Sequence, residues 1–198
     1  MYPQFVEVEG KQYKINTDYR VAIECNRIAE DGTIGKLERS LAVIYMLYGD
    51  EGIDNPQHYE KLLSLGRQYL LCGKEFDEES NKKPDMDFDQ DYGLIWSSIY
   101  SEYNGFDIDK EEIHWWRFND MIESLSNSEL GNCCALNRVR NYRNIDPKTI
   151  KDAKTRKEVI ETQKKIALKK YQKKKKEPTQ EQRDRANELL KQLGIERK

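Results

Sequence analysis

Apolar positions near the start of the chain alternate as they do in strands. Residues 5–8 (FVEV) form one short β-like run, and residues 13–15 (YKI) form the next. Glu9-Gly10-Lys11 between them supplies a turn in which glycine can adopt positive φ. The pattern predicts a β-hairpin, and because a lone hairpin is marginal in water, we expect it to pack on the helices that follow.

From residue 16 onward the apolar spacing changes to that of amphipathic helices. A first helix is expected from a cap at Asn16 or Thr17 to about Glu30. The second carries an apolar stripe of Leu37, Leu41, Ile44 and Tyr48, ended by Gly49 and Gly52. The third starts at Asn55-Pro56 and closes at Gly73. These elements predict a first lobe over residues 1–73.

Residues 74–86 are polar and contain Pro84, so they predict a surface loop that leads to a second lobe over residues 87–146. An aromatic-rich helix is expected from about 88 to 103. A second one follows a capping box at Asp109-x-x-Glu112, and the two are predicted to pack as an αα-hairpin. A short helix should follow from 126 to about 141.

The last part of the chain, 147–198, predicts a charged helical extension. No Gly or Pro occurs between residues 148 and 176, which favours one long exposed helix, and a shorter helix is expected after a capping box at Thr179-x-x-Gln182. The predicted fold is therefore mainly α, with an N-terminal β-hairpin packed on a helical bundle (residues 1–146) and extended C-terminal helices.

The distribution of charge also separates the C-terminal extension from the rest of the chain. The net charge is −2, yet residues 151–198 hold 17 basic against 8 acidic side chains, which leaves an acidic body and a basic tail. Charged residues make up 35% of the chain, so much of it must be solvated surface. No apolar run is long enough for a membrane span, and the N-terminus lacks a signal-peptide pattern. We therefore expect a protein of the cytoplasm, without contact to a membrane.

Candidate chemistry is sparse. The four cysteines form no C-x-x-C pair and are interpreted as small buried hydrophobes. The acidic run at Asp85, Asp87, Asp89 and Asp91 fails the EF-hand pattern and favours a helix N-terminus. His58 and His114 have no partner in a catalytic arrangement and predict packing roles. No phosphate-binding glycine loop occurs. We therefore expect no catalytic, cofactor-binding or metal-binding residues.

Two features could bind a partner instead. Lys173, Lys174, Lys175 and Lys176 form a basic run that fits an acidic protein surface; nucleic acid is the alternative, but the tail has only Tyr171 as an aromatic for base stacking. Trp115, Trp116 and Phe118 lie at helical spacing. Adjacent tryptophans point about 100° apart on a helix, so one should face the core and the other a neighbouring element or a partner.

The stretch from residue 92 to 143 also resembles the signature region of the bacteriophage "gp fifteen" proteins of siphophages that infect Gram-positive bacteria. The matching features are IYSEYNG, an acidic spacer, the His114-Trp115-Trp116-x-Phe118 motif, and an Arg-bearing segment from Arg138 to Arg143. The likeness extends over roughly residues 1–147. It implies a non-catalytic tail-assembly chaperone in the host cytoplasm that binds the tape-measure and tail-tube proteins, with self-association also possible. The alternative function is a nucleic-acid-binding phage regulator acting through Lys169 to Lys176.

Overall fold

The chain opens with the predicted hairpin. In the computed structural model, which describes residues 2–74, 84–127 and 133–171, β1 (Phe5–Val8) pairs antiparallel with β2 (Lys11–Lys14). Glu9 and Gly10 form the two-residue turn with φ of 51° and 79°. Positive φ at both turn residues is the type I′ geometry that matches the twist of paired strands. The hairpin packs on α2 and α3 through its buried side, which includes Tyr13.

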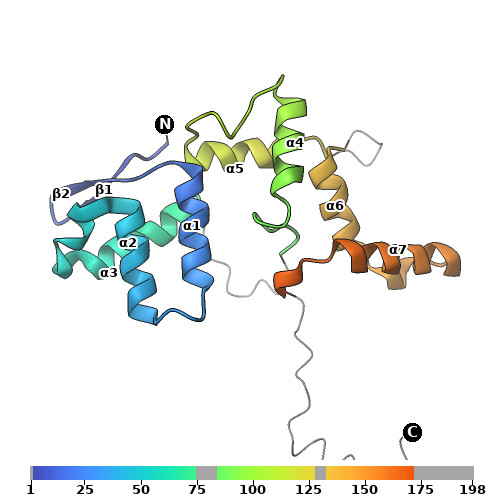
Figure 1. The fold of residues 1–198 in the computed structure, drawn as a ribbon, viewed down its shortest axis with the longest axis horizontal. Coiled ribbons are helices and arrows are strands. Elements are labelled where there is room, and N and C mark those ends of the chain that lie inside the picture. Colours follow the sequence, from blue (N-terminus) through green and yellow to red (C-terminus); the bar gives the residue numbers. More distant parts are fainter. Residues whose placement is uncertain (1, 75–83, 128–132, 172–198) are drawn as a thin grey trace, which may run out of the picture. The chain divides into compact units, whose positions relative to one another are not determined.

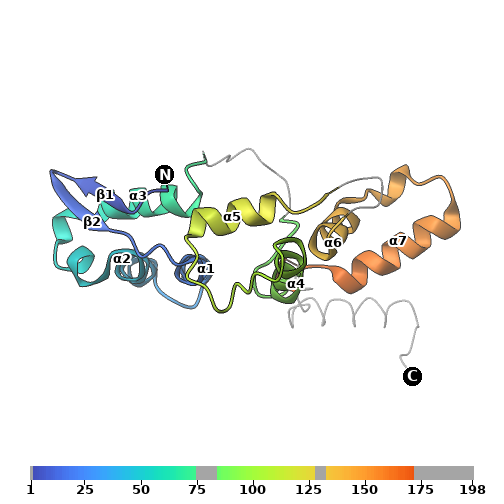
Figure 2. The same ribbon diagram turned by 90° about the horizontal axis from the view of Figure 1, so that it is seen from above.

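Within the described residues the rest of the fold is helical, as predicted (Figures 1 and 2). The α-helices are α1 (Tyr19–Glu30), α2 (Lys36–Ile53), α3 (Tyr59–Leu70), α4 (Tyr92–Glu102), α5 (Trp115–Glu123), α6 (Ala135–Asn144) and α7 (Ala153–Ile166). Three short 3₁₀ helices are η1 (Pro56–His58), η2 (Pro147–Thr149) and η3 (Lys169–Tyr171). The described residues up to Ile166 belong to one compact unit, and the described residues after it lie outside that unit.

The first three helices form one packed group. α2 contacts both α1 and α3, and its residues Ile44 and Leu47 are almost fully buried. Gly66 on α3 makes the close approach possible, because a Cβ there would lie 2.9 Å from a methyl of Leu47. The predicted end of α2 at Gly49 is a break rather than a stop: this residue has φ 65° and ψ −157°, a conformation that favours glycine, and the helix then resumes to Ile53.

The predicted capping box at Asp109 and Glu112 is wrong. α5 begins only at Trp115, where the His114 ring nitrogen Nδ1 accepts the Trp116 N–H at 3.1 Å. The preceding segment is extended because its backbone bonds to the start of α1: the Tyr19 N–H donates to the Ile113 carbonyl, and the Trp115 N–H donates to the Thr17 carbonyl. Tertiary pairing therefore outcompetes the local helix signal.

The predicted αα-hairpin of the two aromatic helices is also wrong. α5 packs chiefly on α1, and α4 packs chiefly on α6, while α4 and α5 meet only weakly and lie crosswise (Figures 1 and 2). The connecting segment with Ile108 and Ile113 separates them, and both isoleucines are buried. The next helix, α6, starts at Ala135 with the Cys134 sulfur as its cap, later than residue 126.

The predicted long C-terminal helix is broken within the described residues. Asp152 caps α7, whose first residue is Ala153, and the helix stops at Ile166. The Ile166 carbonyl accepts a hydrogen bond from Arg143 Nε at 2.8 Å, which ties the end of α7 to α6. The predicted helix after Thr179 lies outside the described residues.

A buried ion pair holds the second half of the compact unit together. Arg143 on α6 donates from both terminal nitrogens to the two carboxylate oxygens of Asp91 at 2.6 and 2.8 Å, and these side chains are 8% and 2% exposed. The same guanidinium donates to the Asp85 carbonyl at 2.8 Å. Together with its bond to Ile166, these contacts join the segment before α4 to α6 and α7.

Candidate functional site

The aromatic motif of α5 divides between the core and a helix contact. Trp115 is 3% exposed and Phe118 is fully buried, stacked on Tyr19 with ring centroids 4.2 Å apart. These two side chains therefore offer no surface to a partner, and the sequence-based assignment of both as partner-binding residues is corrected. They are buried because their side of α5 faces α1 and the segment with Phe88.

Trp116 points to a neighbouring element, as one of the two tryptophans was expected to do. Its indole N–H donates to the Tyr69 carbonyl at 2.9 Å, and its ring stacks on the Tyr69 ring. A Cβ on Gly73, which has φ of 72°, would lie 3.1 Å from the Trp116 ring. Trp116 thus fastens α5 to the end of α3 and stays half-buried. The remaining predicted site residues, Lys173, Lys174, Lys175 and Lys176, lie outside the described residues.

Both histidines have structural partners. His58 is 7% exposed, and its Nδ1 lies 2.6 Å from the Tyr13 hydroxyl, while its Nε2 lies 3.4 Å from a Glu9 carboxylate oxygen. The ring thereby joins η1 to the hairpin. His114 caps α5 through Nδ1, and its Nε2 lies 2.9 Å from the Pro3 carbonyl oxygen. These contacts account for both rings as packing and capping groups.

The acidic run before α4 is occupied by protein contacts. Asp85 accepts from Arg140, Asp87 accepts backbone N–H groups of residues 89 and 90, Asp89 pairs with Arg27, and Asp91 pairs with Arg143. Within the described ranges no group of acidic, histidine and cysteine residues has the arrangement of a metal site. The run stabilises the turn into α4 through these contacts.

The cysteine thiols are free, and burial suppresses the reactivity of two of them. Desolvation raises the pKa of Cys25 from 9.0 to about 12 and that of Cys72 to about 11. Since the thiolate is the reactive form, this rise in pKa lowers the reactivity of Cys25 near neutral pH.

We expect a maleimide at pH 8 to label the half-buried Cys133 first and to leave Cys25 unlabelled until the chain unfolds. Pulse labelling with mass spectrometry measures this order, and the chain unfolded in guanidinium is the control. Rapid native labelling of Cys25 would contradict the burial.

An apolar stripe along the first half of α2 is exposed. Leu37 and Tyr45 are 70% and 53% exposed, and the half-buried Leu41 lies between them at helical spacing, while Ile34, in the bend just before α2, is 37% exposed. We call these four residues the α2 stripe. The sequence predicts that Leu37 and Leu41 continue the buried stripe of Ile44 and Tyr48, and for Leu37 this is wrong. Leu37 lies on a side of the first turn of α2 that faces solvent, so the stripe leaves the core there.

A broad depression adjoins the far end of the α2 stripe. Its walls come from the end of β2, the start of α1, the break in α2 and the extended segment before α5, and Tyr45 is part of its lining. The cavity measures about 980 Å³ and is open to solvent. Tyr45 therefore connects the stripe to a hollow large enough for several side chains of a partner.

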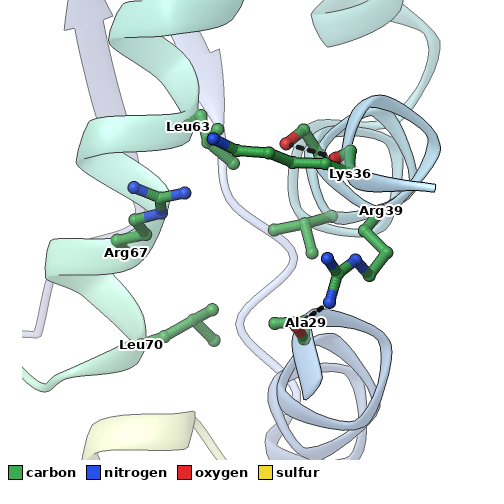
Figure 3. A pocket seen from close by; sticks show the side chains of 8 residues that line it. Ala29, Lys36, Arg39, Leu63, Arg67 and Leu70 are labelled. Carbon is green, nitrogen blue, oxygen red and sulfur yellow. Dashed lines mark hydrogen bonds between the residues drawn. The ribbon is translucent and has the colours of Figure 1, made fainter. Parts of the chain in front are cut away.

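A smaller cavity lies on another side of α2, where this helix faces α3 and the end of α1 (Figure 3). It measures about 190 Å³, and its apolar lining is Ala29, Val43, Leu63 and Leu70. Three cations, Lys36, Arg39 and Arg67, stand around it, with Ser40 as the further polar residue. We call it the cationic cavity. Sequence patterns missed it because its residues come from three helices and form no motif.

The chain is similar to one family of known proteins. A family model described as "Bacteriophage Gp15 protein" matches residues 2–168. A search of curated proteins finds no significant match, and a search of solved structures finds none either. Among the described helices, none combines the length and the apolar character that a transmembrane helix needs.

The family match spans most of the chain and includes the hairpin, all seven described α-helices and both cavities. The helical fold with its N-terminal hairpin agrees with the fold predicted from the spacing of apolar positions. The chain belongs to the Bacteriophage Gp15 protein family.

Proposed function

We propose that this protein is a non-catalytic tail-assembly chaperone of a siphophage, which binds the tape-measure protein, the tail-tube protein, or both in the host cytoplasm. Family membership supports a phage role. The observation that carries the binding role is the α2 stripe, because exposed apolar side chains at helical spacing are how helical proteins accept an apolar helix of a partner.

The chemistry of the expected partner fits this surface. A tape-measure protein is a long helical protein with apolar stripes that must be kept from aggregating before assembly. Leu37 and Tyr45 offer an apolar contact, while the acidic body around them keeps the complex soluble through net charge. Among the described residues, the polar groups of the aromatic motif, the histidines and the acidic run serve structural contacts, which supports adhesion rather than catalysis.

Co-expression with the tape-measure protein of the same phage tests the proposal. We expect the full chain to keep the tape-measure protein in the soluble fraction and to co-purify with it. A variant with Leu37→Asn, Leu41→Asn and Tyr45→Asn should reduce capture at least tenfold, because the apolar contact is the main attraction.

Tyr142→Asn provides the control, since Tyr142 is 40% exposed on α6, away from the stripe. Circular dichroism establishes that all variants are folded. If the triple variant captured the tape-measure and tube proteins as well as the unchanged chain does, the proposed surface would be wrong. If the unchanged chain captured neither protein, the proposed function would be wrong.

A further inference from the structure

We propose that the cationic cavity binds carboxylate side chains of an acidic amphipathic helix in a partner protein. The inference rests on the proposed function for the partner being a helical protein. It goes further because it assigns a charge to the face of that helix and a second contact surface to this chain.

Three positively charged side chains surround the cavity. Lys36 and Arg39 come from one edge of α2, and Arg67 stands across from them on α3 (Figure 3). No carboxylate belongs to the lining. Across the described ranges, no ion pair joins any of these three cations to an acidic side chain. Three unpaired cations around one hollow repel each other, and an anion placed among them relieves that repulsion.

A backbone carbonyl holds one of the three cations, Arg39, in place. Arg39 Nη1 donates to the Ala29 carbonyl at 3.0 Å, which fixes the guanidinium at the rim; among the described residues its other N–H groups have no acceptor. Its charge also lowers the pKa of Asp31, but the larger causes there are hydrogen bonds from Thr33. A guanidinium fixed in this way is preorganised for a carboxylate, since part of its side-chain entropy is already spent.

The cavity is small, and its lining is partly apolar. About 190 Å³ is less than the roughly 300 Å³ at which small-molecule pockets begin, but it admits one or two side chains. Val43, Leu63 and Leu70 provide an apolar floor below the charged rim. A ligand that places an apolar side chain inward and acidic side chains at the rim matches both features. An acidic amphipathic helix has that pattern on one face.

The three cations lie in a part of the chain that is acidic overall, which makes the cavity selective for an acidic partner. Residues 1–150 hold 28 acidic against 17 basic side chains, so this body as a whole repels an acidic partner. A local group of three cations directs such a partner to one place and disfavours the rest of the surface.

The test uses the full chain and a fluorescently labelled amphipathic peptide. The peptide has leucines at every third and fourth position and glutamates beside them; matched peptides carry lysine or glutamine in place of glutamate. We expect saturable binding of the glutamate peptide by fluorescence anisotropy, about tenfold weaker binding of the glutamine peptide, and no binding of the lysine peptide. Added salt should weaken the interaction, because it screens the rim charges.

Lys36→Gln combined with Arg67→Gln should weaken binding of the glutamate peptide about tenfold. Neither side chain takes part in a described hydrogen bond, so the variant should fold normally. Lys61→Gln is the matched control, because Lys61 is an exposed cation on α3 outside the cavity lining. Equal weakening by Lys61→Gln, unchanged binding by the double variant, or failure of the glutamate peptide to bind would overturn the proposal.

Two further outcomes separate this inference from the proposed function. Peptide binding through the cavity without capture of a tail protein would support the cavity and remove the proposed function. Capture of the tape-measure protein without any cavity-dependent peptide binding would support the proposed function and refute the binding role of the cavity. If sedimentation showed the chain to be a dimer that the double variant dissociates, the occupant would be a second copy, and the assignment to a partner protein would be wrong.

Discussion

Replacing Asp91 by alanine lowers the free energy of unfolding by about 3–5 kcal/mol, according to the geometry of the Asp91–Arg143 pair. Both side chains are buried, and removal of the carboxylate leaves a guanidinium charge without its partner in a dry environment. The Asp87 N–H also loses the acceptor that Asp91 provides at 3.0 Å. Urea unfolding followed by circular dichroism measures the change.

Lys110→Ala is the comparison variant, since its ion pair with Asp107 is at the surface, with the lysine 79% exposed. It should leave the unfolding midpoint almost unchanged, because exposed ion pairs contribute little. Arg143→Lys should behave more like Asp91→Ala, because a lysine cannot reproduce the paired contact with Asp91 together with the bonds to the Asp85 and Ile166 carbonyls. A loss below about 1 kcal/mol in Asp91→Ala would refute the role of this pair.

Phe118→Ala is expected to cost a similar amount, about 3–5 kcal/mol. Its ring is fully buried and contacts the rings of Tyr19, Trp115 and Phe88, so alanine would leave a cavity among three aromatic side chains that are held by the backbone around them. Thermal or urea unfolding gives the magnitude.

Phe5→Ala makes the same chemical change at a residue that is 51% exposed, and it should cost far less. The comparison also decides between two roles for the α5 motif. A Phe118→Ala protein that kept its full stability but lost a tail-protein partner would restore the sequence-based interpretation of this residue as a binding anchor. Loss of stability, with binding lost only as the chain unfolds, agrees with its position in the core.

The partner surfaces argued above differ from the ones that sequence patterns favour. The aromatic motif predicts a binding surface, yet Trp115 and Phe118 are buried in the core. Among the described residues, the α2 stripe and the cationic cavity are open to solvent. Leucines and lysines on a helix have no distinctive pattern, so only burial and proximity between helices separate them from ordinary surface.

The sequence by itself determined the elements that depend on local interactions. The hairpin follows from its two-residue turn, where Gly10 adopts positive φ readily, and the cap of α1 is Asp18, one or two residues after the predicted Asn16 or Thr17. The mainly helical class follows from the 3.6-residue spacing of apolar positions, whereas Gly49, predicted as an end of α2, only interrupts the helix. The signature over residues 92–143 also indicated the family whose model matches residues 2–168.

Tertiary structure alone decided which of these elements meet. The segment before Trp115 has a local capping signal but is extended, because its backbone bonds to the start of α1. α7 ends at Ile166, where Arg143 holds the last carbonyl. The exposure of Leu37 and the convergence of Lys36, Arg39 and Arg67 depend on where α1 and α3 lie against α2. Such placements result from contacts between residues far apart in the chain. The periodic pattern within one helix cannot predict these contacts, because it depends only on neighbouring residues.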